Sequence, residues 1–452
     1  MLQRFADYIR LHGLIAEGER TLLAVSGGRD SVCLAHLAHQ LHLPFAIAHC
    51  NFHLRPSDCD RDQEFVRSLA QSLHVPFFTT DFDTHAYAQA QGYSLEQAAR
   101  LLRYAYFAHL CQSEHYSRLA TAHHLDDSIE TFFLNLFRGT GIAGLHGILP
   151  LSHLTLPPTD TAVADAPPIS LTVVHPMLCF SRAEIDAYLA QHQLAYVDDS
   201  TNFEPEVQRN RIRLQLMPLL RELYPSVDTT MQANIHRLHE VEQVYRLHIE
   251  DLRRKLCHRV APRLPWLSMP IDAFPLTSLA TLSPRSTLLF ELLRPYGFNA
   301  SVVANIEASL PSPQSGSQFC SPTHRAAIDR DQLLVAPIPP PTAPTLTIRE
   351  TTLPSSPRTD ACQIYVAPTS LRLPLRLRPW HPADRFCPFG MSGSRLVSDF
   401  LKDAKLNALE KPHVQLLVDA SDRVVWVVGL RADNRFRVHQ AGDACWLVSV
   451  SQ

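Results

Sequence analysis

The first half of the chain alternates short apolar runs with longer amphipathic stretches. Four apolar runs have the length and composition of buried strands, and the segments after them show the three- and four-residue spacing of helices. This alternation predicts a doubly wound parallel α/β sheet, in which ligands bind at the carboxyl ends of the strands. The predicted strands are Thr21–Val25, Phe45–His49, Pro76–Thr80 and Leu119–Ala122, and the predicted helices are Val32–Leu41, Asp60–Leu73, Leu95–Cys111 and Asp127–Phe137.

The pattern becomes irregular after the fourth predicted strand. The proline-, threonine- and alanine-rich stretch Pro150–Thr172 predicts a surface insertion. Helical spacing returns at Ser181–Gln191 and at Gln208–Leu220, and an apolar stripe from Ile235 to Leu256 predicts one long helix. Further helices are predicted at Ser286–Leu293 and Val302–Leu310.

The last part of the chain begins with a stretch, Ala336–Pro344, whose prolines predict a stiff extended linker. Leu371–Arg378 alternates leucine with arginine or proline, which predicts an edge strand with a basic outer face, and Arg423–Leu430 predicts a second strand. We therefore predict an α/β domain over residues 1–222, a mainly helical middle domain over 223–336, a linker over 337–346 and a small α+β domain over 347–452.

Composition narrows the class of protein. Of the 452 residues, 46 % are hydrophobic and 19 % charged, which is typical of a globular protein and excludes a disordered chain. No apolar run is long enough to cross a membrane and the N-terminus lacks an apolar leader, so we expect a cytoplasmic protein without a membrane partner. The ten cysteines are isolated, which predicts reduced thiols. Because the net charge is −3, a polyanion would have to bind at a local basic patch.

The segment Leu22–Ser31 carries the strongest chemical signal, since two adjacent glycines separate an apolar strand from a helix. Glycines at this position let backbone N–H groups converge on an anion, and the helix directs its positive end to the same place. Ser26 and Ser31 add hydroxyl groups, and Asp30 is suited to Mg²⁺. The motif is neither a Walker A loop nor a dinucleotide fingerprint. A plain Gly-Gly turn is the alternative.

A group of carboxylates follows the fourth predicted strand. Asp126, Asp127 and Glu130 share one face of the first turn of a helix, directly after His123 and His124. Carboxylates so close together repel one another unless they are solvated or share a cation. The sequence therefore favours a functional site here, and simple N-capping of the helix is the alternative.

Three further segments are candidates for binding phosphate or nucleic acid. Residues 139–147 hold four of the fifteen glycines, which predicts backbone close to a ligand, with a flexible loop as the alternative. Arg100 and Arg103 follow Glu96 at helical spacing, where an exposed ion pair is the alternative. The basic helix start Gln208–Arg213 is suited to phosphate.

The loop from Ser26 to Ser31 resembles the pyrophosphate-binding Ser-Gly-Gly-x-Asp-Ser loop of the N-type ATP pyrophosphatases. Over about residues 20–220, the order and spacing of the motifs resemble the tRNA(Ile)-lysidine synthetases of that superfamily. Shorter matches extend into the C-terminal part. The motifs that carry the resemblance are the loop, His49–Arg55 with Ser57 and Asp60, Glu96…Arg100…Arg103-Tyr104, His123-His124-x-Asp126-Asp127-x-x-Glu130-Thr131, Arg138-Gly139-x-Gly141, Asp199-x-x-Asn202…Arg209-Asn210-x-Ile212-Arg213, and in the tail Pro382–Asp384, Gly393–Arg395 and Val425–Gly429.

The resemblance implies an ATP-dependent ligase. Its substrates would be free L-lysine and the wobble cytidine of a tRNA(Ile) with a CAU anticodon, and ATP and Mg²⁺ would be required. Cytosine O2 would attack the α-phosphate and release pyrophosphate, and the lysine ε-amine would then displace AMP from C2 to form lysidine. The oligomeric state is not implied, and a homodimer is left open.

The resemblance also implies roles for individual residues. Pyrophosphate and ATP would be held by the loop, the catalytic groups would come from the carboxylate and arginine motifs, and arginines elsewhere would contact the tRNA. The implied residues are Ser26, Gly27, Gly28, Arg29, Asp30 and Ser31 for ATP; Asp30, Asp127, Glu130, His123, Arg103 and Arg209 for catalysis, with Asp30 and Asp127 as metal ligands; and Arg100, Arg138, Asn202, Arg213, Arg376 and Arg378 for tRNA or substrate.

The chain departs from the family pattern at two points. His175 stands before Pro176 where the family suggests an arginine, and the insertion Pro150–Thr172 is longer than usual. Three other functions are weighed against the resemblance. A tRNA thiolase of the same superfamily would need sulfur-carrying cysteines, a NAD- or GMP-synthetase-like enzyme would leave the later motifs unexplained, and a non-catalytic nucleotide-binding protein would not need the acids.

Overall fold

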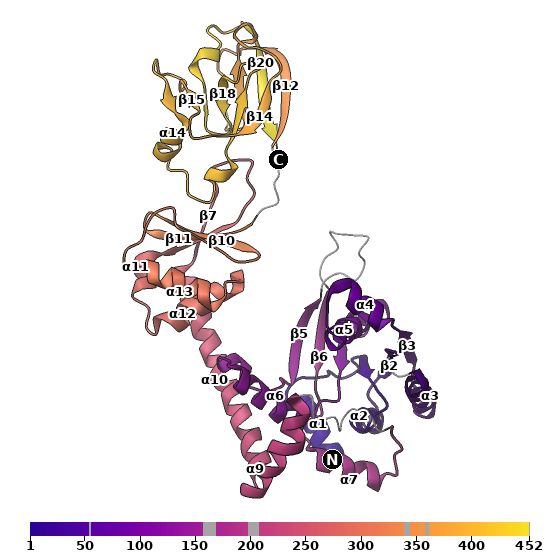
Figure 1. Ribbon diagram of the computed structural model, residues 1–452. Helices are drawn as coiled ribbons and strands as arrows, with labels where there is room; N and C mark the ends of the chain where they lie inside the picture. The colour runs from indigo at the N-terminus through magenta and orange to yellow at the C-terminus, as the bar shows by residue number, and fades with distance from the viewer. Residues whose placement is uncertain (54–55, 157–168, 198–207, 339–343, 358–360, 452) are drawn as a thin grey trace. The chain divides into compact units, whose positions relative to one another are not determined.

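The computed structural model describes residues 1–451 apart from 54–55, 157–168, 198–207, 339–343 and 358–360 (Figure 1). Residues 56–59 are described as backbone only. The chain divides into two compact units, Met1–Val244 and Tyr245–Gln452. Among the described residues, no helix combines the length and the apolar character that crossing a bilayer requires.

The first unit is built around a six-stranded sheet with the order β3-β2-β1-β4-β6-β5. All neighbouring pairs are parallel except β5 and β6, which run antiparallel. The order reverses between β1 and β4, and in a doubly wound sheet ligands bind at such a switch point. The predicted fold class is confirmed. The strands are β1 Thr21–Ala24, β2 Phe45–Asn51, β3 Phe77–Asp81, β4 Arg118–Ala120, β5 Leu151–Leu156 and β6 Ile169–Val174.

Helices cover both faces of this sheet. Neighbouring residues of a strand point to opposite sides, and in β1 both sides are apolar, so each face must be covered. Leu23 of β1 packs into one apolar cluster with α1, α2, α3 and α7, whereas Leu22 packs into another with α5. The helices predicted in this half are confirmed. The helices are α1 Leu2–Leu11, α2 Arg29–Gln40, α3 Pro56–Ser72, α4 Thr84–Gln91, α5 Leu95–Ser113, α6 Leu125–Arg138, α7 Arg182–Gln191, α8 Gln208–Arg211, α9 Met217–Leu223 and the start of α10 Val227–Leu256, with a 3₁₀ turn η1 at Ile142–Gly144.

The predicted insertion Pro150–Thr172 is wrong at both of its ends. Residues 151–156 and 169–174 form the antiparallel pair β5 and β6 (Figure 1). Leu171 and Val173 alternate with polar residues and are buried against α5, which is the signal of a half-buried strand. The centre of the insertion, 157–168, lies outside the described residues.

The predicted helix Gln208–Leu220 contains a change of helix type. Between α8 and α9 the chain forms a π-helical segment, η3, over Ile212–Leu216. A π segment adds one residue to a helical turn, and such segments are frequent at functional sites. Arg213 lies in this segment.

The second unit begins with a five-stranded antiparallel sheet, which the prediction of a mainly helical middle domain missed. The predicted helices are present, but the short buried runs between them are strands, and periodicity cannot separate such runs from buried helix. The sheet has the order β7-β8-β11-β10-β9. Its elements are β7 His258–Val260, β8 Ile271–Pro275, β9 Gln318–Cys320, β10 His324–Asp329, β11 Gln332–Pro337, α11 Leu276–Ala280, α12 Arg285–Leu293, η4 Arg294–Tyr296 and α13 Ala300–Ser309.

The remaining chain forms small sheets around a core that includes Phe386, Trp426 and Phe436, as expected of an α+β domain. The predicted edge strand is confirmed as β14, although it is shorter than predicted. Half of the predicted linker 337–346, residues 339–343, lies outside the described residues, and its ends at Pro337 and from Thr345 onward belong to β11 and β12. The elements are β12 Thr345–Thr352, β13 Gln363–Val366, η5 Pro368–Ser370, β14 Arg376–Pro379, β15 Arg385–Phe386, β16 Arg395–Leu396, α14 Val397–Asp403, η6 Lys411–His413, β17 Gln415–Val418, β18 Val424–Val427, β19 Arg431–Ala432, η7 Asn434–Phe436 and β20 Ala444–Ser451.

Gly147, at the end of the glycine-rich stretch, is required by the fold. Its φ is 60°, and a Cβ there would lie 2.8 Å from the backbone oxygen of Ser128 in α6. We expect Gly147→Ala to lower the free energy of unfolding by at least about 1–2 kcal/mol in chemical denaturation. Gly141→Ala is the matched control, since Gly141 has a φ of −77° and open space around it. Equal effects of the two substitutions would contradict this account.

Candidate active site

The loop between β1 and α2 has the shape that its glycines predict. Gly27 has a φ of 94°, and its N–H donates to Ser31 Oγ at 3.2 Å. The N–H of Gly28 donates to Ser26 Oγ at 3.3 Å, and Ser31 Oγ donates to the Gly28 carbonyl at 2.8 Å. Val197 N–H closes the outside of the loop by donating to the Gly27 carbonyl at 3.0 Å. The loop is thus held open at the N-terminus of α2, where an anion is favoured.

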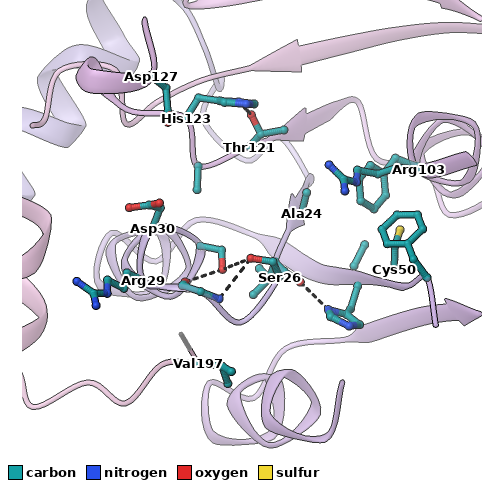
Figure 2. Close-up of a pocket in the computed structure, with 18 of the residues that line it drawn as sticks. Ala24, Ser26, Arg29, Asp30, Cys50, Arg103, Thr121, His123, Asp127 and Val197 are labelled. Atoms are coloured by element: carbon teal, nitrogen blue, oxygen red, sulfur yellow. Dashed lines mark hydrogen bonds between the residues drawn. The ribbon is translucent and has the colours of Figure 1, made fainter. Parts of the chain in front are cut away.

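This loop borders a cavity of about 500 Å³ at the carboxyl ends of β1, β2 and β4, the switch point of the sheet. Figure 2 shows Ser26 and Asp30 on one side of the cavity, His123 on another and Arg103 on a third. Of the predicted site residues, those that line the cavity are Ser26, Gly28, Arg29, Asp30, Ser31, Arg103, His123, Asp127 and Arg213.

Two predicted arginines and two predicted acids meet at one wall of the cavity. Glu130 is 1 % exposed, and its carboxylate accepts from Arg209 Nε at 2.7 Å and from Arg213 Nε at 2.7 Å. Asp127 Oδ1 accepts from Nη2 of the same two arginines, at 3.1 and 3.3 Å. Burial alone would raise the pKa of Asp127, but His124 and Arg209 outweigh it and hold this pKa below its usual range. Asp127 is therefore charged, and both acids are paired with arginine.

Asp30 has a partner that the sequence analysis did not single out. Arg182, the first residue of α7, donates from Nη1 and Nη2 to the two carboxylate oxygens of Asp30 at 2.6 and 2.9 Å. Burial raises the pKa of Asp30, although His124 and Arg182 act in the opposite direction. The backbone N–H of Arg182 also donates to Asp126 Oδ2 at 2.8 Å, so α7 and α6 begin at the same place. Asp126 is paired in turn with Arg221, at 2.5 Å.

The two adjacent histidines have opposite electrostatic surroundings. The ring of His124 is buried, with its nitrogens 3.4 Å from Asp127 Oδ2, 3.6 Å from Asp126 Oδ2 and 3.8 Å from Asp30 Oδ1. Burial opposes protonation, yet these carboxylates raise the pKa of His124. His123 lines the cavity and hydrogen-bonds through Nδ1 to Thr121 Oγ1 at 2.8 Å, and burial lowers its pKa. Of the two rings, His123 is thus the one that burial keeps neutral, whereas the carboxylates around His124 favour its protonated form.

The remaining predicted residues are more scattered. Arg103 lies over the Phe52 ring at 5.1 Å, whereas Arg100 lies over Tyr104 at 5.0 Å and outside the set of cavity-lining residues. Arg138, at the end of α6, is exposed and donates to Gln208 at 3.5 Å. Asn202 lies outside the described residues.

Strand β14 carries the predicted basic face, but acids neutralise it. Arg378 donates to both oxygens of Asp384, at 2.8 and 2.7 Å, and from Nε to Asp422 at 3.1 Å. Its side chain is only 15 % exposed. Arg376 also donates to Asp422, at 3.0 Å, and stays exposed. The arginine pattern alone did not reveal these acids, because they come from other loops.

The fold and the loop define a PP-loop protein, and residues 3–220 match the family model of the PP-loop domain of the ATP_bind_3 type. Residues 271–338 match the TilS substrate binding domain, and residues 375–450 match the TilS substrate C-terminal domain. Among curated relatives, the tRNA(Ile)-lysidine synthase of Parabacteroides distasonis is 35 % identical over 99 % of both chains. That of Bacteroides thetaiotaomicron is 36 % identical over 97 % of both. The chain belongs to the tRNA(Ile)-lysidine synthase family, whose members are ligase-type enzymes.

His175, where the family suggests an arginine, lies buried beside the cavity. Its Nδ1–H donates to the Leu149 carbonyl at 2.8 Å, and its ring is 5.1 Å from that of His123. Burial, followed by the neighbouring His123, lowers the pKa of His175 to about 4. The folded protein therefore holds this ring in its neutral form at neutral pH.

This burial predicts a loss of stability in acid. Between about pH 6.5 and pH 4 the unfolded chain protonates His175 and the folded chain does not, so the unfolding free energy is complete above this window and falls as the pH drops through it. At 1.36 kcal/mol for each pKa unit, the loss is about 3 kcal/mol. We expect chemical denaturation of His175→Gln, which can still donate to Leu149, to show a shallower fall than the wild type. Parallel curves for the two proteins would contradict this interpretation.

Proposed function

We propose that this chain ligates free L-lysine to C2 of the wobble cytidine of tRNA(Ile) with a CAU anticodon, consuming ATP and releasing AMP and pyrophosphate. The observation that carries the proposal is the opening of the Ser26–Ser31 loop into the same cavity as Asp127, Arg213 and His123, in a chain of this family. One surface thus offers a phosphate site, acids for an ammonium group and a neutral imidazole. We place the reaction in the cytoplasm, where these substrates occur together.

The loop would hold the phosphates of ATP. Ser26, Ser31 and the first N–H groups of α2 face the place where negative charge grows as pyrophosphate leaves, and arginines on the cavity wall would stabilise the same charge. Arg29, at the start of α2, and Arg103, on α5, are the two lining arginines without an ion pair to the acid cluster. Arg29 pairs with Asp186 at 3.4 Å and would exchange this partner to reach the nucleotide, whereas Arg103 would contact the nucleotide or the activated base.

Asp30 and Asp127 fit a Mg²⁺ ion that is completed by substrate. Among the described residues, no group of three or more His, Cys, Asp or Glu side chains forms a metal site by itself. Mg²⁺ commonly takes one or two carboxylates together with substrate phosphates, and these two acids line the cavity beside the loop. When bound, the ion would offset charge on the departing pyrophosphate.

Two bond exchanges complete the reaction. Cytosine O2 forms a bond to the α-phosphorus while the bond to the β-phosphate oxygen breaks. The lysine nitrogen then bonds to C2, and the C2–O bond breaks with release of AMP. The ammonium must first lose a proton, and His123, neutral because of its burial, is the proposed acceptor. Asp127 and Glu130 would hold the ammonium, in exchange with Arg209 and Arg213.

A sulfur-transfer function is less well supported. Cys50 is the one cysteine among the described residues that line the cavity, and burial raises its pKa to about 12. Such a thiol stays protonated at neutral pH, whereas sulfur transfer requires a thiolate. The nine cysteines with described side chains are all free.

Removal of the Asp30 charge tests the proposed reaction. We expect Asp30→Asn to lower the release of AMP from ATP, in the presence of tRNA(Ile) and lysine, by at least about 100-fold, because the cation and the phosphates lose an anchor. Asp7→Asn is the control, since Asp7 is an exposed acid of α1 that pairs with Arg10. Normal turnover by Asp30→Asn would remove the loop acid from the mechanism, and release of ADP in place of AMP by the wild type would refute the function.

The rest of the tRNA would be contacted by residues outside the cavity, and a turn in the C-terminal part is a candidate for this contact. In the C-terminal part, a turn after β15 presents Phe389 and Met391 with 51 % and 49 % of their surface exposed. Hydrogen bonds from Phe389 N–H to the Ala432 carbonyl, at 2.9 Å, and from Gly390 N–H to Asn434, at 3.2 Å, fix the turn. An exposed aromatic ring on a fixed turn is suited to stacking on an unpaired base.

Two arginines flank this turn. Arg385 of β15 donates to Ser394, and Arg431 of β19 precedes Ala432; among the described residues neither forms a salt bridge. Their positive charge is therefore free for phosphate, unlike that of Arg378. We assign the tRNA contact of the C-terminal part to this turn; Arg376 of β14 is exposed but already paired with Asp422, so it would make at most a secondary contact.

Substitutions on this turn should act on tRNA and not on ATP. We expect Phe389→Ala combined with Arg385→Gln to weaken tRNA binding about tenfold or more and to reduce its salt dependence, since a stacked base and a phosphate contact are both lost. The affinity for ATP should not change. The comparison is Arg376→Glu in strand β14, where we expect a smaller effect because Asp422 already neutralises the arginine. A larger effect of Arg376→Glu would assign the tRNA to the strand.

A further inference from the structure

The four acids at the start of α2 and α6 are each paired with arginine, but the four arginines differ in one respect. Arg209 and Arg213 each contact two acids, Asp127 and Glu130. Arg221 likewise contacts both Asp126 and Asp228. Each of these three arginines keeps a carboxylate partner if one of its acids is engaged by another group.

Arg182 differs in that no second acid partner is found for it within the part of the chain that the structure describes. Among the described residues, Asp30 is the one acid within salt-bridge distance of its guanidinium, at 2.6 Å. Its backbone is fixed by the hydrogen bond from N–H to Asp126, so the start of α7 stays beside the cavity while the side chain can change its partner. Both Arg182 and the phosphate loop line that cavity, and Figure 2 shows Asp30 facing into it.

Binding of Mg²⁺ by Asp30, which is part of the proposed function, removes the charge partner of Arg182. A guanidinium cannot lose its proton at physiological pH, and an unpaired charge in a partly buried wall is unfavourable. The phosphate chain of ATP is the anion that enters the same cavity, and the forked N–H groups of arginine match phosphate oxygens as well as they match a carboxylate.

We propose that Arg182 is a nucleotide-binding residue, which pairs with Asp30 in the free protein and transfers to the phosphate chain of ATP when Asp30 takes up the metal ion. The exchange keeps the guanidinium paired in both states. In the free protein it also holds the Asp30 carboxylate in place at the mouth of the loop.

A structural role is the competing explanation, in which Arg182 serves only to neutralise Asp30. A double-mutant cycle separates the two roles. The full-length chain is titrated calorimetrically with α,β-methylene-ATP, without tRNA or lysine, once with Mg²⁺ and once with EDTA. The four proteins are wild type, Arg182→Gln, Asp30→Asn and the double variant.

If Arg182 binds phosphate, Arg182→Gln weakens binding about tenfold or more in the wild-type background and also in the Asp30→Asn background. With EDTA, Asp30→Asn binds the analogue more tightly than the wild type, and most of that gain is lost in the double variant. If Arg182 only neutralises Asp30, its substitution has no effect once Asp30 is asparagine. That result, or no effect in either background, would overturn the proposal.

Two further variants serve as controls for the loss of the arginine charge and for the loss of an ion pair that holds α7. Arg182→Lys keeps the charge but loses the fork, so it should recover part of the affinity. Arg4→Gln removes another arginine that holds α7, through Glu184 at 2.6 Å, away from the residues that line the cavity, and it should leave nucleotide affinity unchanged. Thermal unfolding of each variant verifies folding. If the wild type itself fails to bind the analogue, the proposed function fails; if it binds and Arg182 has no effect, the failure is confined to Arg182.

Discussion

The arrangement of the site depends on the neutralisation of buried carboxylates by arginine. Asp127 lies on the first turn of α6 and Glu130 lies three residues further along the helix, and burial would penalise both negative charges. Arg209 and Arg213 offset that penalty, and in doing so they tie the helical segment after α7 to the start of α6. Since Arg209 and Arg213 each contact both acids, removal of one arginine would leave two buried carboxylates to share the other. The ion pairs that neutralise the acids of the site therefore also hold the start of α6 against the helical segment that supplies the arginines.

This constraint has a chemical consequence for the resting protein. Asp30 and Asp127, the two acids among the described residues that line the cavity, are both paired with arginine, so a cationic ligand meets carboxylates that already have partners. Substrates must exchange with internal partners, acid for ammonium and arginine for phosphate.

Much of this site could be predicted from local sequence. Glycine at position 27 is needed for a positive φ between a strand and a helix, and the carboxylates of α6 are three and four residues apart; both are short-range patterns. Arg182 left no such signal, because its partner Asp30 lies 152 residues away and only the parallel sheet brings the two together. The acids that neutralise Arg378 were missed for the same reason.

The fold shows the same division between local and non-local information. Long helices and the strands between them were predicted because their periodicity extends over many residues. The five-stranded sheet of the second unit was missed because strands of three to six residues, such as β8 and β10, are too short to show a period. The strands β5 and β6 were hidden by the proline-rich composition between them.

The π segment over Ile212–Leu216 sets the phase of the helical stretch that supplies the arginines. Arg209, Arg213, Met217 and Arg221 follow one another at four-residue steps, and all four face α6, through Glu130, the apolar contact of Met217 and Asp126. In a regular α-helix, steps of four residues advance by about 400° and drift around the axis by about 40° each time. The wider turn takes up part of that drift and keeps the four side chains in one row. If the same residues formed a regular α-helix, the eight steps from Arg213 to Arg221 would come to about 800°, which is about 80° more than two full turns, and Arg221 would point away from Asp126.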